Sequence, residues 1–179
     1  MNIKKKKTLL AWMYFGLQML AVAFIIYILN SLVFNFAVVR GTSMEPTLYD
    51  RDILICIKFG YQPEYGDIVL CRSGKGYENE LVKRIIGVPG DRIDIDNTKG
   101  IVYINGEPLD EAYCTNITYT TGDIKFPVVV PENQYFVLGD NREVSVDSRY
   151  SEIGMISDKK IDGHITYRIF PFTKIGKVK

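Results

Sequence analysis

An uncharged stretch over residues 8–39 constrains this chain more than any other feature. As an α-helix, its 32 residues would extend about 48 Å, whereas the hydrocarbon core of a bilayer is about 30 Å thick. The stretch is long enough to cross a membrane once. We therefore predict a transmembrane segment over residues 8–39.

Two other interpretations fit this stretch less well. A cleavable signal peptide has an apolar region of about 7–15 residues that ends at a small-x-small site, and the sequence Phe-Ala-Val-Val-Arg at residues 36–40 contains no such site. A buried helix of a globular protein rarely exceeds about 25 residues without polar interruption. Four lysines at residues 4–7 precede the stretch, and positive charge favours the cytoplasmic side. We expect residues 1–7 in the cytoplasm and residues 40–179 outside it, in a single-pass protein of the cell membrane.

Charge and cysteine content exclude several classes of function. The chain has 22 Lys and Arg against 21 Asp and Glu, and every acidic residue follows position 39, so no strongly basic domain is present and no nucleic-acid partner is expected. Cys56, Cys71 and Cys114 match no zinc-binding spacing, and His164 is the single histidine. We predict no metal and no cofactor.

Residues 40–179 change from a continuous apolar pattern to short β-like runs between turn signals. These runs are residues 52–57, 67–71, 81–86, 101–104, 128–130, 135–138 and 161–169. The pattern predicts a mainly β, antiparallel domain, with one short helical turn near residues 151–160. Residues 94–130 are more polar, and we expect them to form a small β insertion that contains a hairpin turn at Asn105-Gly106.

Three residues could carry hydrolytic chemistry. His164 allows at most one histidine-based triad, and its strand context also fits a half-buried structural histidine. Ser43 follows the uncharged stretch by four residues, in a turn, and Lys83 lies in an apolar strand. Because side chains alternate along a strand, Lys83 and Arg84 point to opposite faces, and one of them must be covered. A buried lysine can stay neutral and activate a serine, although a turn serine and a solvated lysine remain alternatives.

Five short sequence blocks, in this order, resemble those of type I signal peptidases, the membrane-bound serine-lysine peptidases of family S26 that remove signal peptides from exported proteins. The blocks are GTSMEPTL at 41–48, GDIV at 66–69, KRIIGVPGD at 83–91, GDNR at 139–142 and SVDSR at 145–149. The resemblance implies that Ser43 is the nucleophile and Lys83 the general base. It also implies that Ser145 holds the Lys83 amine, and that the Ser43 N–H and a second donor near Gly41 bind the oxyanion.

The same resemblance implies a supporting ion pair between Asp147 and Arg149, and a β-rich core with a β insertion. Its substrates would be exported preproteins, bound extended at the membrane with small residues at positions −1 and −3. We expect Met44, Leu48 and Val82 to form the walls of the pockets for those residues.

Three other functions remain open from the sequence. The domain could be a non-catalytic binding module of similar fold, although Ser43 and Lys83 are both intact. It could be a self-processing serine-lysine protease, but a membrane segment rather than a DNA-binding region precedes the site. It could also be a peptidase dedicated to pilins or to one secretion system.

Overall fold

The computed structural model describes residues 3–73, 80–114 and 117–178, which form two units, residues 1–34 and residues 35–179. The first unit consists of helix α1 (Ile3–Val33), and its segment Leu10–Val33 has a mean hydropathy of 2.0. At roughly 1.5 Å per residue, these 24 residues extend about 36 Å, enough to cross a bilayer core. Crossing of a membrane by this helix stays a prediction.

Helix α1 ends before the limit of the segment predicted over residues 8–39. Residues Phe34–Val38 form strand β1 instead, with Ala37 buried and both neighbours of Ala37 exposed. Val39 is buried as well, so burial alternates along this segment with the period of a strand. A continuous apolar run hides such a change, because a helix in lipid and a strand over a core both need apolar side chains.

The larger sheet of the second unit contains eight strands among the described residues. Its path is β1, β2 (Ile53–Ile57), β11 (Ile161–Phe170), β3 (Ile68–Arg72), β4 (Glu80–Gly87), β9 (Gln134–Leu138) and β10 (Ile156–Ser157), with β12 (Gly176–Lys177) paired to β11. The registered pairs are antiparallel. Two single-turn 3₁₀ helices, η1 (Asp158–Lys160) and η2 (Phe172–Lys174), flank β11.

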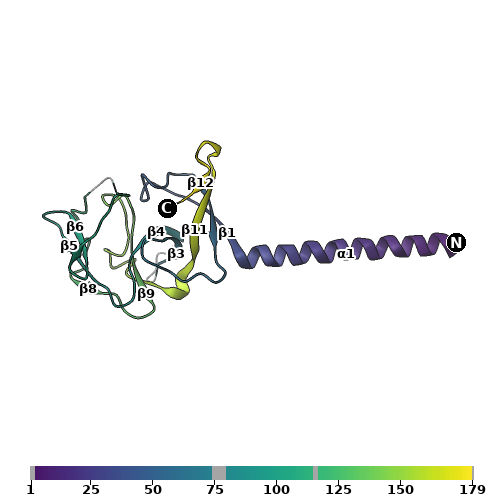
Figure 1. The fold of residues 1–179 in the computed structure, drawn as a ribbon, viewed down its shortest axis with the longest axis horizontal. Helices are drawn as coiled ribbons and strands as arrows, with labels where there is room; N and C mark the ends of the chain where they lie inside the picture. The colour runs from purple at the N-terminus through teal and green to yellow at the C-terminus, as the bar shows by residue number, and fades with distance from the viewer. Residues whose placement is uncertain (1–2, 74–79, 115–116, 179) are drawn as a thin grey trace. The chain divides into compact units, whose positions relative to one another are not determined.

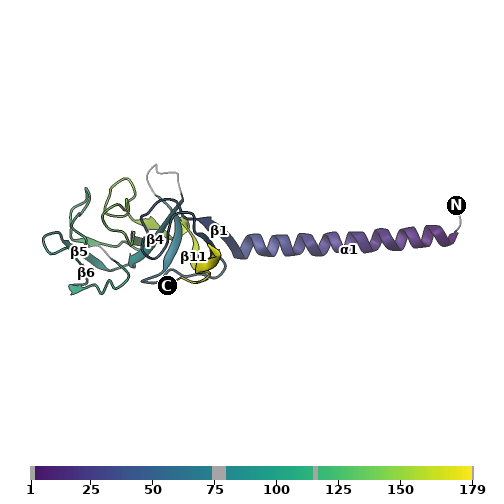
Figure 2. The ribbon, with the colours of Figure 1, turned by 90° about the horizontal axis from the view of Figure 1, so that it is seen from above.

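A smaller sheet lies between β4 and β9 in the chain. Its order is β7 (Glu107–Pro108), β6 (Ile101–Ile104), β5 (Arg92–Asp96) and β8 (Val128–Val129). Asn105 and Gly106, with φ of 55° and 93°, make the tight turn between β6 and β7. Both views place β5 and β6 at one end of residues 35–179 and β4 and β11 at the other (Figure 1, Figure 2).

One apolar cluster joins the two sheets and fixes β4 in place. Ile86 of β4 and Phe136 of β9 pack with Ile93 of β5 in a fully buried core. At Gly87 an added Cβ would lie 2.8 Å from the end of the Ile93 side chain, so a larger residue would displace Ile93 within this core. The strand that carries Lys83 is therefore held by both sheets.

The structure confirms a mainly antiparallel β fold preceded by one apolar helix. All seven predicted runs contain strands, and η1 lies in the predicted helical turn. The sequence analysis missed β1 and β5, of five residues each, and the two-residue strands β7, β10 and β12. The small sheet extends from Arg92 to Val129, close to the expected insertion over residues 94–130.

Candidate active site

Lys83 lies in a part of β4 that has one unpaired edge among the described strands. Residues 80–83 pair with β3, and pairing with β9 begins only at Arg84. Lys83 is nevertheless 3% exposed. This burial disfavours the ammonium form and lowers the pKa of Lys83, although the Asp147 carboxylate acts in the opposite direction. A lysine with a lowered pKa can accept a proton.

Ser43 lies in the turn between β1 and β2. Gly41 has a φ of 81°, which favours glycine, and its N–H donates to the Asp50 carboxylate at 2.8 Å. On the other side of Ser43, the chain is anchored by Met44 and Leu48, whose side chains are buried and whose main chains form a 2.8 Å hydrogen bond. These contacts fix the turn that presents Ser43.

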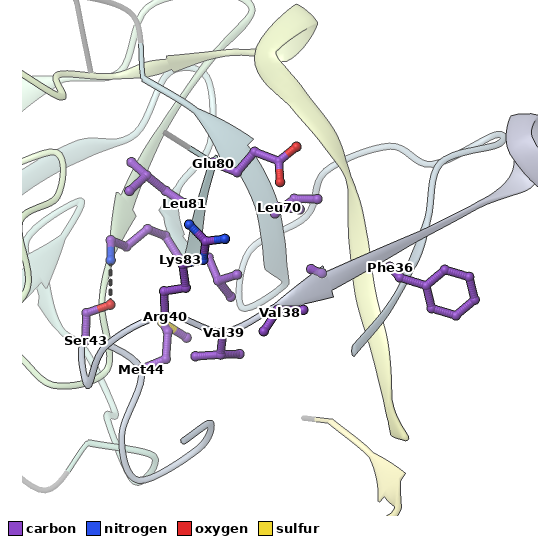
Figure 3. A pocket seen from close by; sticks show the side chains of 12 residues that line it. Phe36, Val38, Val39, Arg40, Ser43, Met44, Leu70, Glu80, Leu81 and Lys83 are labelled. Carbon is purple, nitrogen blue, oxygen red and sulfur yellow. Dashed lines mark hydrogen bonds between the residues drawn. The ribbon is translucent and has the colours of Figure 1, made fainter. Parts of the chain in front are cut away.

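The two candidate residues meet directly. A hydrogen bond of 2.8 Å joins Lys83 Nζ to Ser43 Oγ (Figure 3). This distance is within the range for proton transfer between a nucleophile and its base. Residues 40 positions apart in the chain therefore form a serine-lysine pair, in which a buried amine contacts a hydroxyl.

The turn that follows β9 also contacts the main chain of Ser43. The Asn141 N–H donates to the Ser43 carbonyl oxygen at 3.0 Å. Gly139 passes so close that a Cβ on it would overlap both the Ser43 carbonyl oxygen and the Ser145 hydroxyl. Only glycine permits this approach, so the position of Ser43 depends on residue 139.

A buried ion pair lies beneath this turn. Asp147 accepts hydrogen bonds of 2.8 and 2.9 Å from Arg149, and neither side chain is exposed. The second Asp147 oxygen also accepts the Gly139 N–H at 3.1 Å, and Arg149 donates to the Ser145 carbonyl at 3.1 Å. The Ser145 hydroxyl is buried and has no hydrogen-bond partner, Lys83 included, among the described residues.

A second buried ion pair was missed by the sequence analysis. Arg84, which follows Lys83, donates to both Asp140 oxygens at 2.9 and 2.7 Å. The Thr47 hydroxyl donates to the same carboxylate at 2.6 Å, and Arg84 also donates to the Gly66 carbonyl at 2.8 Å. The pair connects β4, the Ser43 turn and the turn after β9. The one sequence signal for this ion pair was Arg84 itself, a second cationic residue beside Lys83 in an apolar strand.

A groove of about 570 Å³ leads to the Ser43–Lys83 pair. It is lined by Phe36, Ala37, Val38, Val39, Arg40, Ser43, Met44, Leu70, Glu80, Leu81, Val82 and Lys83. Met44 and Val82 are among these lining residues, and their role as walls of substrate pockets stays a prediction. Leu48 is fully buried in the core and is not a lining residue. The sequence analysis did not predict that residues 36–40 line the groove. It assigned residues 36–39 to the transmembrane segment and placed Arg40 directly after it.

The other residues singled out from the sequence lie elsewhere. His164 Nε2 is 3.5 Å from an Asp67 oxygen, and its ring stacks on Tyr61 at a centroid distance of 5.1 Å. His164 does not line the groove. Cys56 and Cys71 are buried, and burial raises the pKa of Cys71 to about 12. Within residues 3–73, 80–114 and 117–178, no three His, Cys, Asp or Glu residues form a group that could hold a metal ion.

A family model and two similar proteins place this chain in the same family. The family model for signal peptidase, peptidase S26, matches residues 10–170. Signal peptidase I S of Bacillus subtilis (strain 168) is 35% identical over 98% of this chain and 97% of its own length. Signal peptidase IB of Staphylococcus aureus (strain Mu50 / ATCC 700699) is 36% identical over 94% of this chain and 93% of its own.

A solved structure has the same fold. The crystal structure of a signal peptidase I from Enterococcus faecalis V583 aligns with a TM-score of 0.50 and 33% sequence identity. The alignment covers 59% of this chain and 98% of that one.

Proposed function

Because this chain belongs to the signal peptidase family, peptidase S26, we propose that Ser43 and Lys83 form the catalytic dyad with which it removes signal peptides from exported preproteins. The 2.8 Å hydrogen bond between the Ser43 hydroxyl and a buried lysine amine is the observation that carries this proposal. Among the described residues, no other serine, threonine or cysteine lines the groove.

In the proposed acylation step, neutral Lys83 accepts the proton of Ser43 as Oγ attacks the carbonyl carbon of the scissile bond. The tetrahedral intermediate collapses when Lys83 returns this proton to the leaving amine, which leaves an ester on Ser43. Lys83 then accepts a proton from a water molecule as the water attacks the ester. The bond between the acyl carbon and Ser43 Oγ breaks, Lys83 returns the proton to Oγ, and the signal peptide leaves with a C-terminal carboxyl group. An ordinary lysine pKa of 10.5 would leave Lys83 protonated at neutral pH, so the lowered pKa is essential.

Stabilisation of the oxyanion is proposed to involve the Ser43 N–H. The Gly41 N–H already donates to Asp50, so it is engaged in this conformation and a second donor would have to come from another group near Gly41. We propose that Ser145 holds the Lys83 amine during catalysis, through a contact that the Ser145 hydroxyl does not make in this conformation. We also propose that Asp147 and Arg149 keep Ser145 in place, and the hydrogen bond from Arg149 to the Ser145 carbonyl supports this second role.

We propose that the groove binds an extended peptide with small side chains at positions −1 and −3. Its floor includes Met44 and Leu70, both buried, and Val82, which packs against the same core. The edge of β4 at residues 80–83 has main-chain groups that β9 does not pair, so a peptide could bind there as an additional strand. We propose that Met44 and Val82 bound the pockets for the −1 and −3 residues, with Leu48 supporting Met44 from the core.

Membrane anchoring is part of the proposal. The apolar residues of α1 would cross the membrane once within residues 8–39. Residues 1–7, four of which are lysines, would lie in the cytoplasm, and residues 40–179 would lie outside it. Ser43 follows the candidate span Leu10–Val33 by ten residues, at most about 36 Å of extended chain. A preprotein whose apolar segment is still in the bilayer would present its cleavage site within this reach.

The test is cleavage of a preprotein that carries a small-x-small site. The detergent-solubilised chain and its Ser43→Ala variant are each incubated with it, and the new N-terminus is identified by mass spectrometry. Cleavage after the site by the parent alone is expected. If both proteins are folded and neither cleaves, or if both cleave equally, the proposed role of Ser43 is wrong.

A further inference from the structure

Two opposite charges line the groove beside the serine-lysine pair. Arg40 and Glu80 are both exposed, and neither forms an ion pair or side-chain hydrogen bond with another described residue. The Arg40 side chain extends across the groove toward β4 (Figure 3). Glu80 is three residues from Lys83, about 10 Å along β4, so its carboxylate lies farther from the reacting groups. Among the described residues, Arg40 therefore has no ion-pair partner, and it lies on the same groove as Ser43.

The proposed function sets the direction in which a substrate would occupy this groove. Strand β1 directly follows the apolar helix, so the Phe36 end of the groove is nearer in the chain to the membrane segment. The apolar part of a signal peptide precedes its cleavage site. Residues −1, −2 and −3 would therefore extend from Ser43 toward Phe36 and Glu80.

Because side chains alternate along an extended peptide, the residue of the groove that the −2 side chain would contact can be inferred. In an extended peptide, residues −1 and −3 point to one face and residue −2 to the other. If −1 and −3 face the floor that contains Met44 and Val82, the −2 side chain faces the open side of the groove. Arg40 is exposed on that side, because the preceding Val39 is buried against the floor.

We infer that Arg40 is a specificity-determining residue that reads the charge of the −2 side chain and favours substrates with Asp or Glu at that position. This inference rests on the proposed function. An acidic −2 side chain would pair with the guanidinium, and a basic one would be repelled. The pair would be exposed to solvent, so the preference is modest, about threefold to tenfold between Asp and Lys.

The test uses three peptides that are identical except for Asp, Asn or Lys at −2, mixed in one reaction and quantified by mass spectrometry. Competition in a single tube gives ratios of kcat/KM that do not depend on the amount of active enzyme. The parent is expected to prefer Asp over Lys about threefold to tenfold at low salt. Arg40→Gln should bring this ratio close to one, and Arg40→Glu should invert it. About 1 M salt should reduce the preference of the parent, because the Debye length falls to about 3 Å.

Arg92→Glu is the matched control, since it makes the same change of charge on β5 in the other sheet, outside the groove. It should keep the ratio of the parent. Equal cleavage of the three peptides by a Ser43-dependent parent overturns the role of Arg40 alone. A preference that survives in Arg40→Glu also overturns it. If the parent cleaves none of the peptides, both this inference and the proposed function fail.

Discussion

Arg84 binds both carboxylate oxygens of Asp140, and the two side chains are 4% and 0% exposed. Arg84 directly follows Lys83, and Asp140 directly follows Gly139, so this ion pair links the neighbours of two residues that shape the site. The Ser43–Lys83 contact therefore depends on a buried electrostatic link between β4 and the turn after β9.

Asp140→Ala should destabilise the fold by about 3–5 kcal/mol, because it leaves the Arg84 guanidinium buried without its carboxylate. Chemical denaturation measures the change. Asp162→Ala is the control, since Asp162 pairs with an Arg72 side chain that is 52% exposed, and it should cost less than about 1 kcal/mol. Equal losses in the two variants would contradict the structural role of the buried pair.

Gly139→Ala should reduce kcat/KM by at least about a hundredfold, equivalent to about 2.7 kcal/mol. The added methyl group has no room between the Ser43 carbonyl and the Ser145 hydroxyl, so the Ser43 turn must shift. Gly176→Ala serves as the control, because a Cβ there meets no atom within 4 Å. Peptide cleavage and thermal unfolding are measured on both variants. Full activity of Gly139→Ala would show that the turn has more freedom than the structure indicates.

His164→Ala should retain most of the peptidase activity. His164 lies on β11, contacts Asp67 and Tyr61, and does not line the groove. The matched comparison is Ser43→Ala, for which activity should be lost. A thousandfold decrease of kcat/KM in a folded His164→Ala variant would favour the histidine-based triad that the sequence alone left open.

The lowered pKa of Lys83 also predicts a pH dependence of stability. Below its folded pKa, Lys83 is charged in both states, and burying the ammonium costs free energy. Between that pKa and the ordinary value of 10.5, the unfolded state binds more protons, so the free energy of unfolding rises with pH. Above pH 10.5 the amine is neutral in both states, and Lys83 adds no further increase to the free energy of unfolding.

The comparison for this prediction is Lys83→Met, which has no titratable group at the site. Relative to it, the parent should gain stability as pH increases, by up to about 1.4 kcal/mol per pH unit. Denaturation at a series of pH values gives the difference. A constant difference up to pH 10.5 would show that the Lys83 amine has an ordinary pKa in the folded state.

Much of this architecture could be predicted from local sequence. Alternating or continuous apolar runs identified the main strands, and the turn residues Asn105 and Gly106 fixed a hairpin. Ser43 and Lys83 could be paired only through the resemblance of several blocks to one family. In isolation, each has an ordinary structural explanation, because a single sequence does not show which distant residues meet.

The features that sequence reasoning missed depend on tertiary contacts. Strand β1 has the composition of a membrane helix, and its alternation becomes visible only when a core lies against Ala37. The partners Arg84 and Asp140 are 56 positions apart and have no local pattern in common. The charge of Arg40 acquires a possible role only when the groove places it across from β4.

The most direct test of the dyad is the pH dependence of kcat/KM for the parent beside Lys83→Arg, between about pH 6 and 10. A guanidinium stays protonated and cannot act as a base. If neutral Lys83 activates Ser43, kcat/KM of the parent rises with pH to a plateau, and Lys83→Arg is at least about a thousandfold less active at every pH. A parent profile without this rise, or an arginine variant within tenfold of the parent, would contradict the mechanism.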